Sequence, residues 1–278
     1  MSAPTFSPAI CLTIAGSDPS GGAGLQADLK TFEAMGVYGA SVVSLLTAQN
    51  TRGVQGVELV SPEFVRAQLD SIFSDLPVRA VKVGALGGAP VIRATVEGLG
   101  AWKGRDLVVD PVMVSKHGSR LLDAEAEALL ADALLPRARV ITPNRSEAAV
   151  LLGWSKAVDD ESARKAAEEL ASRFGVSVLI TGGAGRGSEV VDWLVTPEGT
   201  RRLAHERLES RNRHGAGCTL AAAITAGLAS GDDLETAVVR ARAFVLEAMR
   251  AAPSFGDGEG PLWHRGGTGS RRSVQAAG

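Results

Sequence analysis

The sequence predicts an α/β fold built on one mainly parallel sheet, and three observations support this. Short apolar runs typical of strands buried on both faces recur along the chain. Each run ends in glycine or polar residues and is followed by a stretch with helical periodicity. No repeat or linker divides the 278 residues, so we expect one domain over residues 1–256 and a flexible tail over 257–278.

The first strand–helix unit begins with the apolar run 8–16. The polar, glycine-rich loop 17–24 follows it, and a helix marked by Leu25, Leu29 and Phe32 then closes near Gly36. Open α/β sheets bind ligands at the carboxyl ends of their strands, where this loop lies. Asp28 is expected in the first helical turn, where it either complements the helix dipole or contacts a ligand.

Five further apolar runs predict strands, at 42–46, 80–84, 107–109, 139–142 and 176–180. The loops after them include residues 47–53, 110–118, 143–147 and 181–185. Helices are expected from the Ser61-Pro62 signal and from about Pro90. Strands that alternate with helices pair in parallel, so these loops are expected to gather along one edge of the sheet.

Two segments depart from this alternation. Residues 190–195 and 200–204, joined by a Thr-Pro-Glu-Gly turn, predict an antiparallel hairpin at the sheet edge. Leu220, Ile224 and Leu228 predict a helix over 218–230 with one buried stripe, and a last helix is expected to end near Arg250.

Composition excludes several functional classes. A net charge of −2, a pI of about 6.1 and 4% aromatic residues argue against nucleic-acid binding. Cys11 and Cys218 lie far apart, without the spacing of a disulfide framework or a zinc site. The sequence has neither a secretory leader pattern nor an apolar run long enough to span a membrane, so a reducing cytoplasm is expected.

The stretch 211–220 is the strongest candidate for chemistry. Gly215 and Gly217 let the backbone approach a ligand closely, and a helix that begins there directs its unpaired N–H groups towards an anion. Cys218 at the positive helix end is expected to have a lowered thiol pKa. The competing interpretation is an ordinary turn followed by a small buried cysteine.

Other candidates lie on the strand-end loops. Asp110 follows a strand and could face a cation, cap a helix or form a buried ion pair. Asn144 and Glu147 have the spacing of a capping box, and also suit a hydrated magnesium ion. His117 and His214 are isolated, and Lys116 could meet a phosphate or be solvated. Walker, GxGxxG and GxSxG motifs are absent.

Five motifs together resemble one family. They are TIAGSDPSGGAGLQAD from Thr13 to Asp28, AQNTRG at 48–53, DPVM at 110–113, TPNRSE at 142–147 and GAGC at 215–218. The chain is similar to the hydroxymethylpyrimidine/phosphomethylpyrimidine kinases of thiamine biosynthesis, members of the ribokinase-like superfamily. The resemblance implies a three-layer sandwich, with a central mainly parallel sheet between helices. It also implies ATP-dependent phosphorylation of the pyrimidine's hydroxymethyl group and then of the monophosphate, in a homodimer.

The resemblance also implies residue roles. Cys218 would be the general base or would orient the alcohol, and the N–H groups of Gly215, Ala216 and Gly217 would bind the transferring phosphoryl group. The ring would be held by Gly16, Asp28, Gln49 and Val112. Mg²⁺ and the triphosphate of ATP would be organised by Asp110, Glu147 and Asn144, with Thr181, Gly182 and Gly183 beside the nucleotide.

Three departures from the family pattern bear on substrate breadth. Thr181 stands where many relatives have lysine, Ala216 where many have threonine, and Ala85 where methionine is common. A pyridoxal or pyridoxine kinase of the same fold therefore remains an alternative. A non-catalytic nucleotide or pyrimidine sensor is the alternative from another class.

Overall fold

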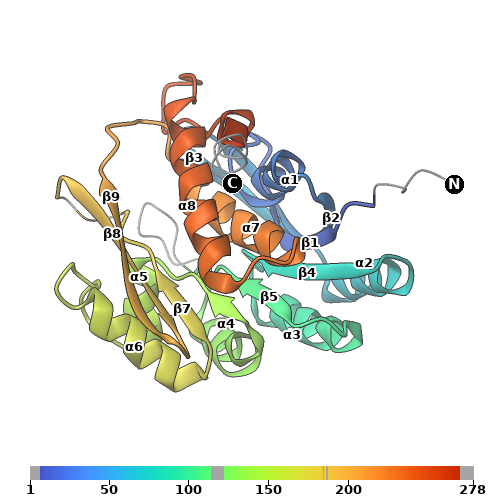
Figure 1. Ribbon diagram of the computed structural model, residues 1–278. Helices are drawn as coiled ribbons and strands as arrows, with labels where there is room; N and C mark the ends of the chain where they lie inside the picture. The colour runs from blue at the N-terminus through green and yellow to red at the C-terminus, as the bar shows by residue number, and fades with distance from the viewer. Residues whose placement is uncertain (1–6, 114–121, 184, 186, 270–278) are drawn as a thin grey trace, which may run out of the picture.

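The computed structural model describes residues 7–113, 122–183, 185 and 187–269. Lys116 and His117 lie outside the described residues, as does the end of the predicted tail from residue 270 onward. The described residues form a nine-stranded sheet with helices on both faces (Figure 1). No helix in these ranges is both long and apolar enough to cross a membrane.

The strand order across the sheet is β3-β2-β1-β4-β5-β6-β7-β8-β9. The strands are β1 (Ile10–Ser17), β2 (Tyr38–Asn50), β3 (Gly53–Leu59), β4 (Val78–Val83), β5 (Asp106–Val109), β6 (Val140–Ile141), β7 (Ser177–Ile180), β8 (Glu189–Thr196) and β9 (Gly199–Glu206). The six strands from β2 to β7 in this order pair in parallel, as predicted, so their carboxyl ends share one edge. The predicted edge hairpin is also confirmed, as β8 and β9.

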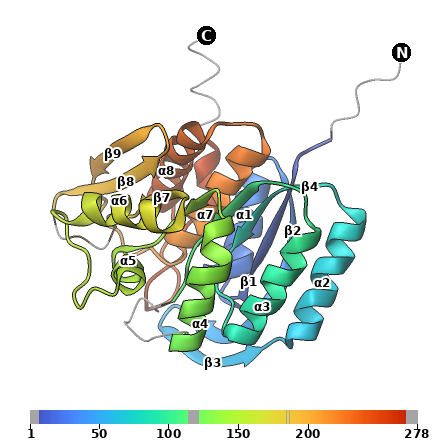
Figure 2. The ribbon, with the colours of Figure 1, turned by 90° about the horizontal axis from the view of Figure 1, so that it is seen from below.

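The helices form two layers, one on each face of the sheet. One layer contains α1 (Gly24–Met35), α7 (Ala216–Ala229) and α8 (Leu234–Arg250). The other contains α2 (Pro62–Asp75), α3 (Ala89–Gly98), α4 (Ala124–Leu129), α5 (Arg145–Leu152) and α6 (Ala163–Phe174). Figure 2 shows α2, α3 and α4 in front of the strands, with α1, α7 and α8 behind them.

The alternation of side chains along each strand explains the two layers. Leu107 and Val109 pack into the core under α2 to α6, whereas Val108 between them packs against α7 and α8. Strands buried on both faces are therefore apolar at successive positions, which is the pattern of continuous apolar runs in the sequence.

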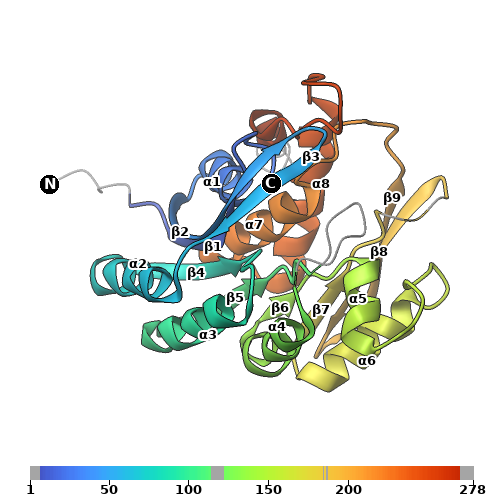
Figure 3. The ribbon, with the colours of Figure 1, turned by 180° about the vertical axis from the view of Figure 1, so that it is seen from behind.

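The prediction of a loop over residues 47–53 is wrong. β2 continues to Asn50 and turns at Gly53, whose φ is 144°, into the antiparallel strand β3 (Figure 3). The end of β2 is polar because it lines a pocket, and its polar residues gave it the composition of a loop.

The helix that begins after Gly215 differs from its prediction in burial. Every residue of α7 from Thr219 to Ala229 is buried, not a single stripe. α7 lies between the sheet and α1 and α8, so all of its sides are covered (Figure 1). Its many alanines allow this close approach.

The predicted tail is wrong for residues 257–269. Leu262 and His264 are buried, and the side chains of His264 and Thr219 are hydrogen-bonded at 3.0 Å. The backbone N–H of Glu259 donates to the carbonyl of Thr51 at 2.9 Å, next to the turn between β2 and β3. This segment therefore packs against α7 and the end of β2.

Candidate active site

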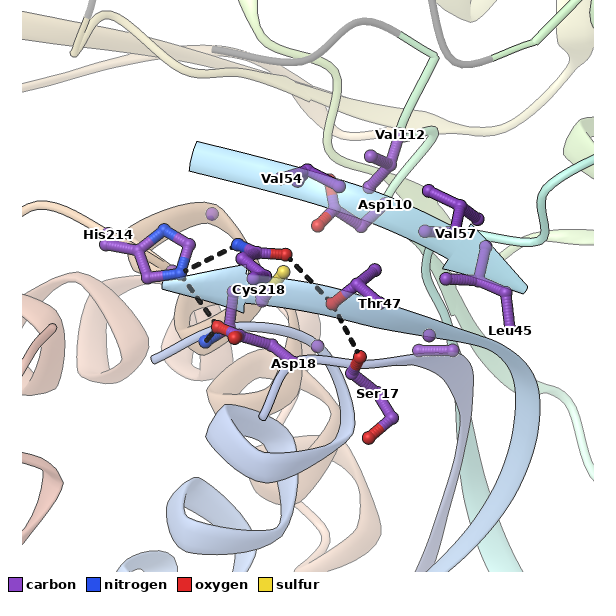
Figure 4. Close-up of a pocket in the computed structure, with 18 of the residues that line it drawn as sticks. Ser17, Asp18, Leu45, Thr47, Val54, Val57, Asp110, Val112, His214 and Cys218 are labelled. Carbon is purple, nitrogen blue, oxygen red and sulfur yellow. Dashed lines mark hydrogen bonds and ion pairs between the residues drawn. The ribbon is translucent and has the colours of Figure 1, made fainter. Parts of the chain in front are cut away.

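A cavity of about 350 Å³ lies at the shared carboxyl edge of the parallel strands, beside the first turn of α7. The residues around it come from segments far apart in the sequence: Gly16 and Asp18, Gln49, Asp110, and Cys218. Figure 4 shows Cys218 and Asp110 among the side chains that line the cavity, together with Thr47 of β2 and Val54 and Val57 of β3. The strand-end loops therefore form one site, as the βα alternation predicts.

The first turn of α7 forms one side of the cavity. Gly215 precedes the helix with a φ of 81°, and a β-carbon at this position would collide with the carbonyl oxygen of Gly22. Only glycine fits there without strain. Gly215, Gly217 and Cys218 line the cavity, so the start of the helix lies at its wall. The N–H of Ala216, between them, donates to the carbonyl of Arg213 at 3.2 Å.

The lowered thiol pKa expected for Cys218 is not found. Burial raises the pKa of the thiol to about 12, and Asp110 and Asp28 add to this effect. The nearby Lys82 ammonium opposes it but does not reverse it. The thiol lines the same cavity as the Asp110 carboxyl group, and its presence lowers the Asp110 pKa. The helix terminus therefore does not produce a thiolate in the ligand-free site.

Two carboxyl groups face the same cavity. Burial raises the pKa of Asp110 to about 6, with Lys82 opposing and Asp28 adding to the shift. Burial and the charge of Asp110 raise the pKa of Glu147 well above its ordinary value. A divalent cation bound between these two buried carboxylates would stabilise their charged forms, and carboxylate oxygens are suitable donors for it. Within the described ranges, no three His, Cys, Asp or Glu side chains cluster as a metal site.

The capping box predicted at Asn144 and Glu147 is confirmed. Asn144 Oδ1 accepts from the N–H groups of Ser146 at 2.9 Å and Glu147 at 3.0 Å. Glu147 Oε2 accepts from the N–H of Asn144 at 2.9 Å. Both residues also line the cavity, so the cap fixes their positions beside Asp110. Their magnesium role stays a prediction.

Asp28 lies outside the cavity, so it is not placed to contact a substrate. It belongs to the second turn of α1, is fully buried and does not line the cavity. Its Oδ2 accepts from Thr13 Oγ1 at 2.6 Å and pairs with Lys82 Nζ at 2.8 Å. The predicted contact with the ring is therefore corrected to a buried ion pair beneath the site.

The other predicted ring contacts do line the cavity. Gly16, Gln49 and Val112 face it, as does Ala85, one of the departures from the family pattern. Their contacts with a substrate stay predictions.

Thr181, Gly182 and Gly183 follow β7 and do not line the cavity. The backbones of Thr181 and Asn144 form an isolated parallel β-bridge just beyond the ends of β7 and β6. The N–H of Gly182 donates to Asp192 Oδ1 at 2.6 Å. They therefore border the Asn144 side of the site, and their nucleotide role stays a prediction.

Sequence reasoning assigned no site role to three polar residues, of which His214 had been noted as an isolated histidine. Asp18, Lys82 and His214 all line the cavity. Lys82 is fully buried; burial lowers its pKa, but Asp28 and Asp110 more than reverse this. A lysine within an apolar strand was the available signal, because buried lysines are rare without a partner. Asp18 and His214 had no such signal, since each makes its contact across 196 positions.

A mainly parallel sheet between two helical layers, with a helix terminus and carboxylates at one strand edge, defines a small-molecule kinase with a ribokinase-like fold. A family model described as phosphomethylpyrimidine kinase matches residues 18–263. The chain belongs to this family and is a phosphotransferase. The predicted family, the three-layer fold and the kinase activity are confirmed.

Curated relatives carry the same resemblance over most of their length. The hydroxymethylpyrimidine/phosphomethylpyrimidine kinase of Rhizobium meliloti is 49% identical over 92% of this chain and 97% of its own. The enzyme of the same description from Escherichia coli is 42% identical over 91% of this chain and 96% of its own.

Solved structures share the fold. The Bacillus subtilis pyridoxal kinase, in an ADP complex, has a TM-score of 0.87 and 35% identity over 94% of this chain and 98% of its own. The Clostridium difficile phosphomethylpyrimidine kinase has a TM-score of 0.76 and 41% identity over 86% of this chain and 99% of its own.

Proposed function

We propose that this kinase uses ATP to phosphorylate 4-amino-5-hydroxymethyl-2-methylpyrimidine, and then phosphorylates the monophosphate to the pyrophosphate, in thiamine biosynthesis. One observation carries the proposal: the α7 terminus lines the same cavity as Gln49 and Val112, the residues expected to contact the ring. The descriptions of relatives that match along almost their whole length support the substrate.

In this reaction the alcohol oxygen attacks the terminal phosphorus of ATP, and ADP leaves. The N–H groups of Gly215, Ala216 and Gly217 would stabilise the transferring phosphoryl group, and the Ala216 N–H would do so in place of its hydrogen bond to the Arg213 carbonyl. Cys218 would orient the hydroxyl group, and Asp110, which lines the same cavity, would be the nearby proton acceptor. A loose phosphoryl-transfer transition state depends on positioning and charge neutralisation, so the neutral thiol suits an orienting role.

Mg²⁺ and ATP complete the proposed site. Asp110 and Glu147 would hold the cation, which would neutralise phosphate charge and offset the cost of burying two carboxylates, the main cause of both raised pKa values. Asn144 and the segment of Thr181, Gly182 and Gly183 would border the nucleotide. We place the reaction in the cytoplasm, which two unpaired cysteines support.

The homodimer is also a proposal. β3 is an edge strand, and its Val54, Val57 and Leu59 side chains are each about half exposed, at 49%, 53% and 52%. An exposed apolar edge strand suits association with a second chain. Light scattering should give twice the chain mass of 28.7 kDa, and Leu59→Lys should halve it. A wild-type mass of one chain would remove the proposal.

Pyridoxal is the second candidate substrate, because pyridoxal kinases share the fold. The Staphylococcus aureus pyridoxal kinase, solved with AMP-PCP and pyridoxal, has a TM-score of 0.86 and 34% identity. Purified protein should therefore be assayed with both alcohols and ATP. We expect kcat/KM for the aminopyrimidine to be at least about tenfold higher, or ~1.4 kcal/mol of transition-state preference. The opposite preference would assign pyridoxal, and absence of ATP turnover would favour the sensor alternative.

A further inference from the structure

A chain of polar contacts joins three segments of the protein at the wall of the cavity (Figure 4). His214 Nε2 lies 2.8 Å from Asp18 Oδ2 and 3.2 Å from the Gln49 amide. The same amide lies 3.2 Å from Thr47 Oγ1, which donates to the carbonyl of Ser17 at 3.0 Å. The chain therefore connects the end of β1, the end of β2 and the residue before Gly215.

The polarity of this chain can be assigned from its Asp18 end. Asp18 Oδ2 also accepts from the N–H groups of Gly22 and Ala23 and from the hydroxyl of Ser20. Burial opposes its charge, but the hydrogen bonds from His214 and Ser20 lower the pKa of Asp18 to about 2. An ionised carboxylate only accepts, so His214 Nε2 carries a proton and donates.

The Thr47 end gives the same answer independently. The Ser17 carbonyl can only accept, so the single Thr47 hydroxyl proton points to it, and Thr47 Oγ1 is left as an acceptor towards Gln49. With Gln49 Nε2 towards His214 Nε2, at 3.2 Å, an N–H of the amide faces the N–H of the imidazole, and two donors oppose each other. Half a turn of the amide places its oxygen towards His214 and its nitrogen towards Thr47, and removes both conflicts.

We propose that Asp18 and His214 are positioning residues that fix the orientation of the Gln49 amide. One Gln49 N–H is then bound to Thr47, and the other is directed to the cavity that Gln49 lines. The cavity would therefore select a heteroaromatic ring with a hydrogen-bond acceptor at this point, such as an unprotonated ring nitrogen. The inference rests on the proposed function, in which Gln49 contacts the ring.

A double-mutant cycle between His214 and Gln49 tests this proposal. His214→Ala and Gln49→Ala should each raise KM for the alcohol by about tenfold, while KM for ATP and kcat change less than about twofold. The double variant should resemble the worse single variant. Asp18→Asn can donate to His214 Nε2, which then accepts a hydrogen bond and no longer fixes the Gln49 amide. This substitution should raise KM for the alcohol when Gln49 is present, but not when it is combined with Gln49→Ala.

His205→Gln is the matched control, because His205 on β9 is hydrogen-bonded to Arg242 of α8 and does not line the cavity. His214→Gln replaces His214→Ala if the alanine variant does not fold. If the wild type does not use the aminopyrimidine, the proposed function fails, and the cycle is measured with pyridoxal. Coupling of the two sites would support the positioning role with either alcohol. Fully multiplicative KM effects, near a hundredfold in the double variant, would overturn it.

Discussion

Lys82 Nζ lies 2.8 Å from Asp28 Oδ2, and neither side chain is exposed to solvent. This ion pair lies under the reacting end of the cavity, where the Lys82 charge acts on Cys218 and Asp110. The site therefore rests on a buried cation whose partner comes from the second turn of α1. Removing either partner leaves an uncompensated charge inside the protein.

Lys82→Met should lower the free energy of unfolding by about 3–5 kcal/mol, because the Asp28 carboxylate loses its partner. Adding Asp28→Asn to this variant should recover most of the loss, since the buried charge is then removed. Urea unfolding of both single variants and the double variant measures the coupling. Losses that simply add would show that the pair does not act as a unit.

Asp110→Asn should stabilise the ligand-free protein at neutral pH. The folded-state pKa of Asp110, about 6, lies above its ordinary value of 3.8, so ionisation costs the folded state free energy. This cost is absent below about pH 4, grows up to about pH 6 and then stays at ~3 kcal/mol. Thermal unfolding at pH 4 and pH 7.5 without Mg²⁺ measures it. A stability difference independent of pH would contradict the assignment.

Gly215→Ala should lower kcat by ~10²-fold or more, because the methyl group forces the α7 terminus away from Gly22. Gly231→Ala is the matched control. Gly231 also has a positive φ, of 97°, but its β-carbon would enter open space, so only the backbone strain of ~1–2 kcal/mol applies. Equal kcat values for the two variants would show that close approach at Gly215 is unimportant.

Glu147→Gln separates the cap from the proposed cation site. Glutamine can make the same capping-box hydrogen bond to the N–H of Asn144 and removes a carboxyl whose pKa is raised by burial, so the unfolding temperature at neutral pH should be retained or rise. The Mg²⁺ concentration for half-maximal activity should rise by about tenfold or more, because one negative oxygen donor is lost. Glu147→Ala should lose both properties. An unchanged Mg²⁺ dependence in both variants would restrict Glu147 to the cap.

Local patterns were sufficient to predict much of the fold. Strands such as β5 are buried on both faces, so their apolar runs are visible in sequence, and the Asn144–Glu147 cap is contained within four residues. The end of β2 was misread because its polar residues face a cavity instead of solvent. A sequence window cannot distinguish these two environments.

The site was predicted less completely because its contacts are not local. Asp28 meets Lys82 across 54 positions, and His214 meets Gln49 across 165. The raised pKa of Cys218 also depends on burial, which outweighs the helix terminus that the sequence indicates. The motifs located the loops correctly, whereas the partners of individual side chains required the assembled sheet.

The central claim is that Cys218 acts on the substrate alcohol at the start of α7. The most direct test is kcat of Cys218→Ala at saturating ATP and aminopyrimidine, with substrate affinity measured separately. We expect kcat to fall by ~10²-fold or more while the substrate dissociation constant stays within about threefold. An unchanged kcat would contradict the claim and leave Cys218 as a packing residue of the cavity wall.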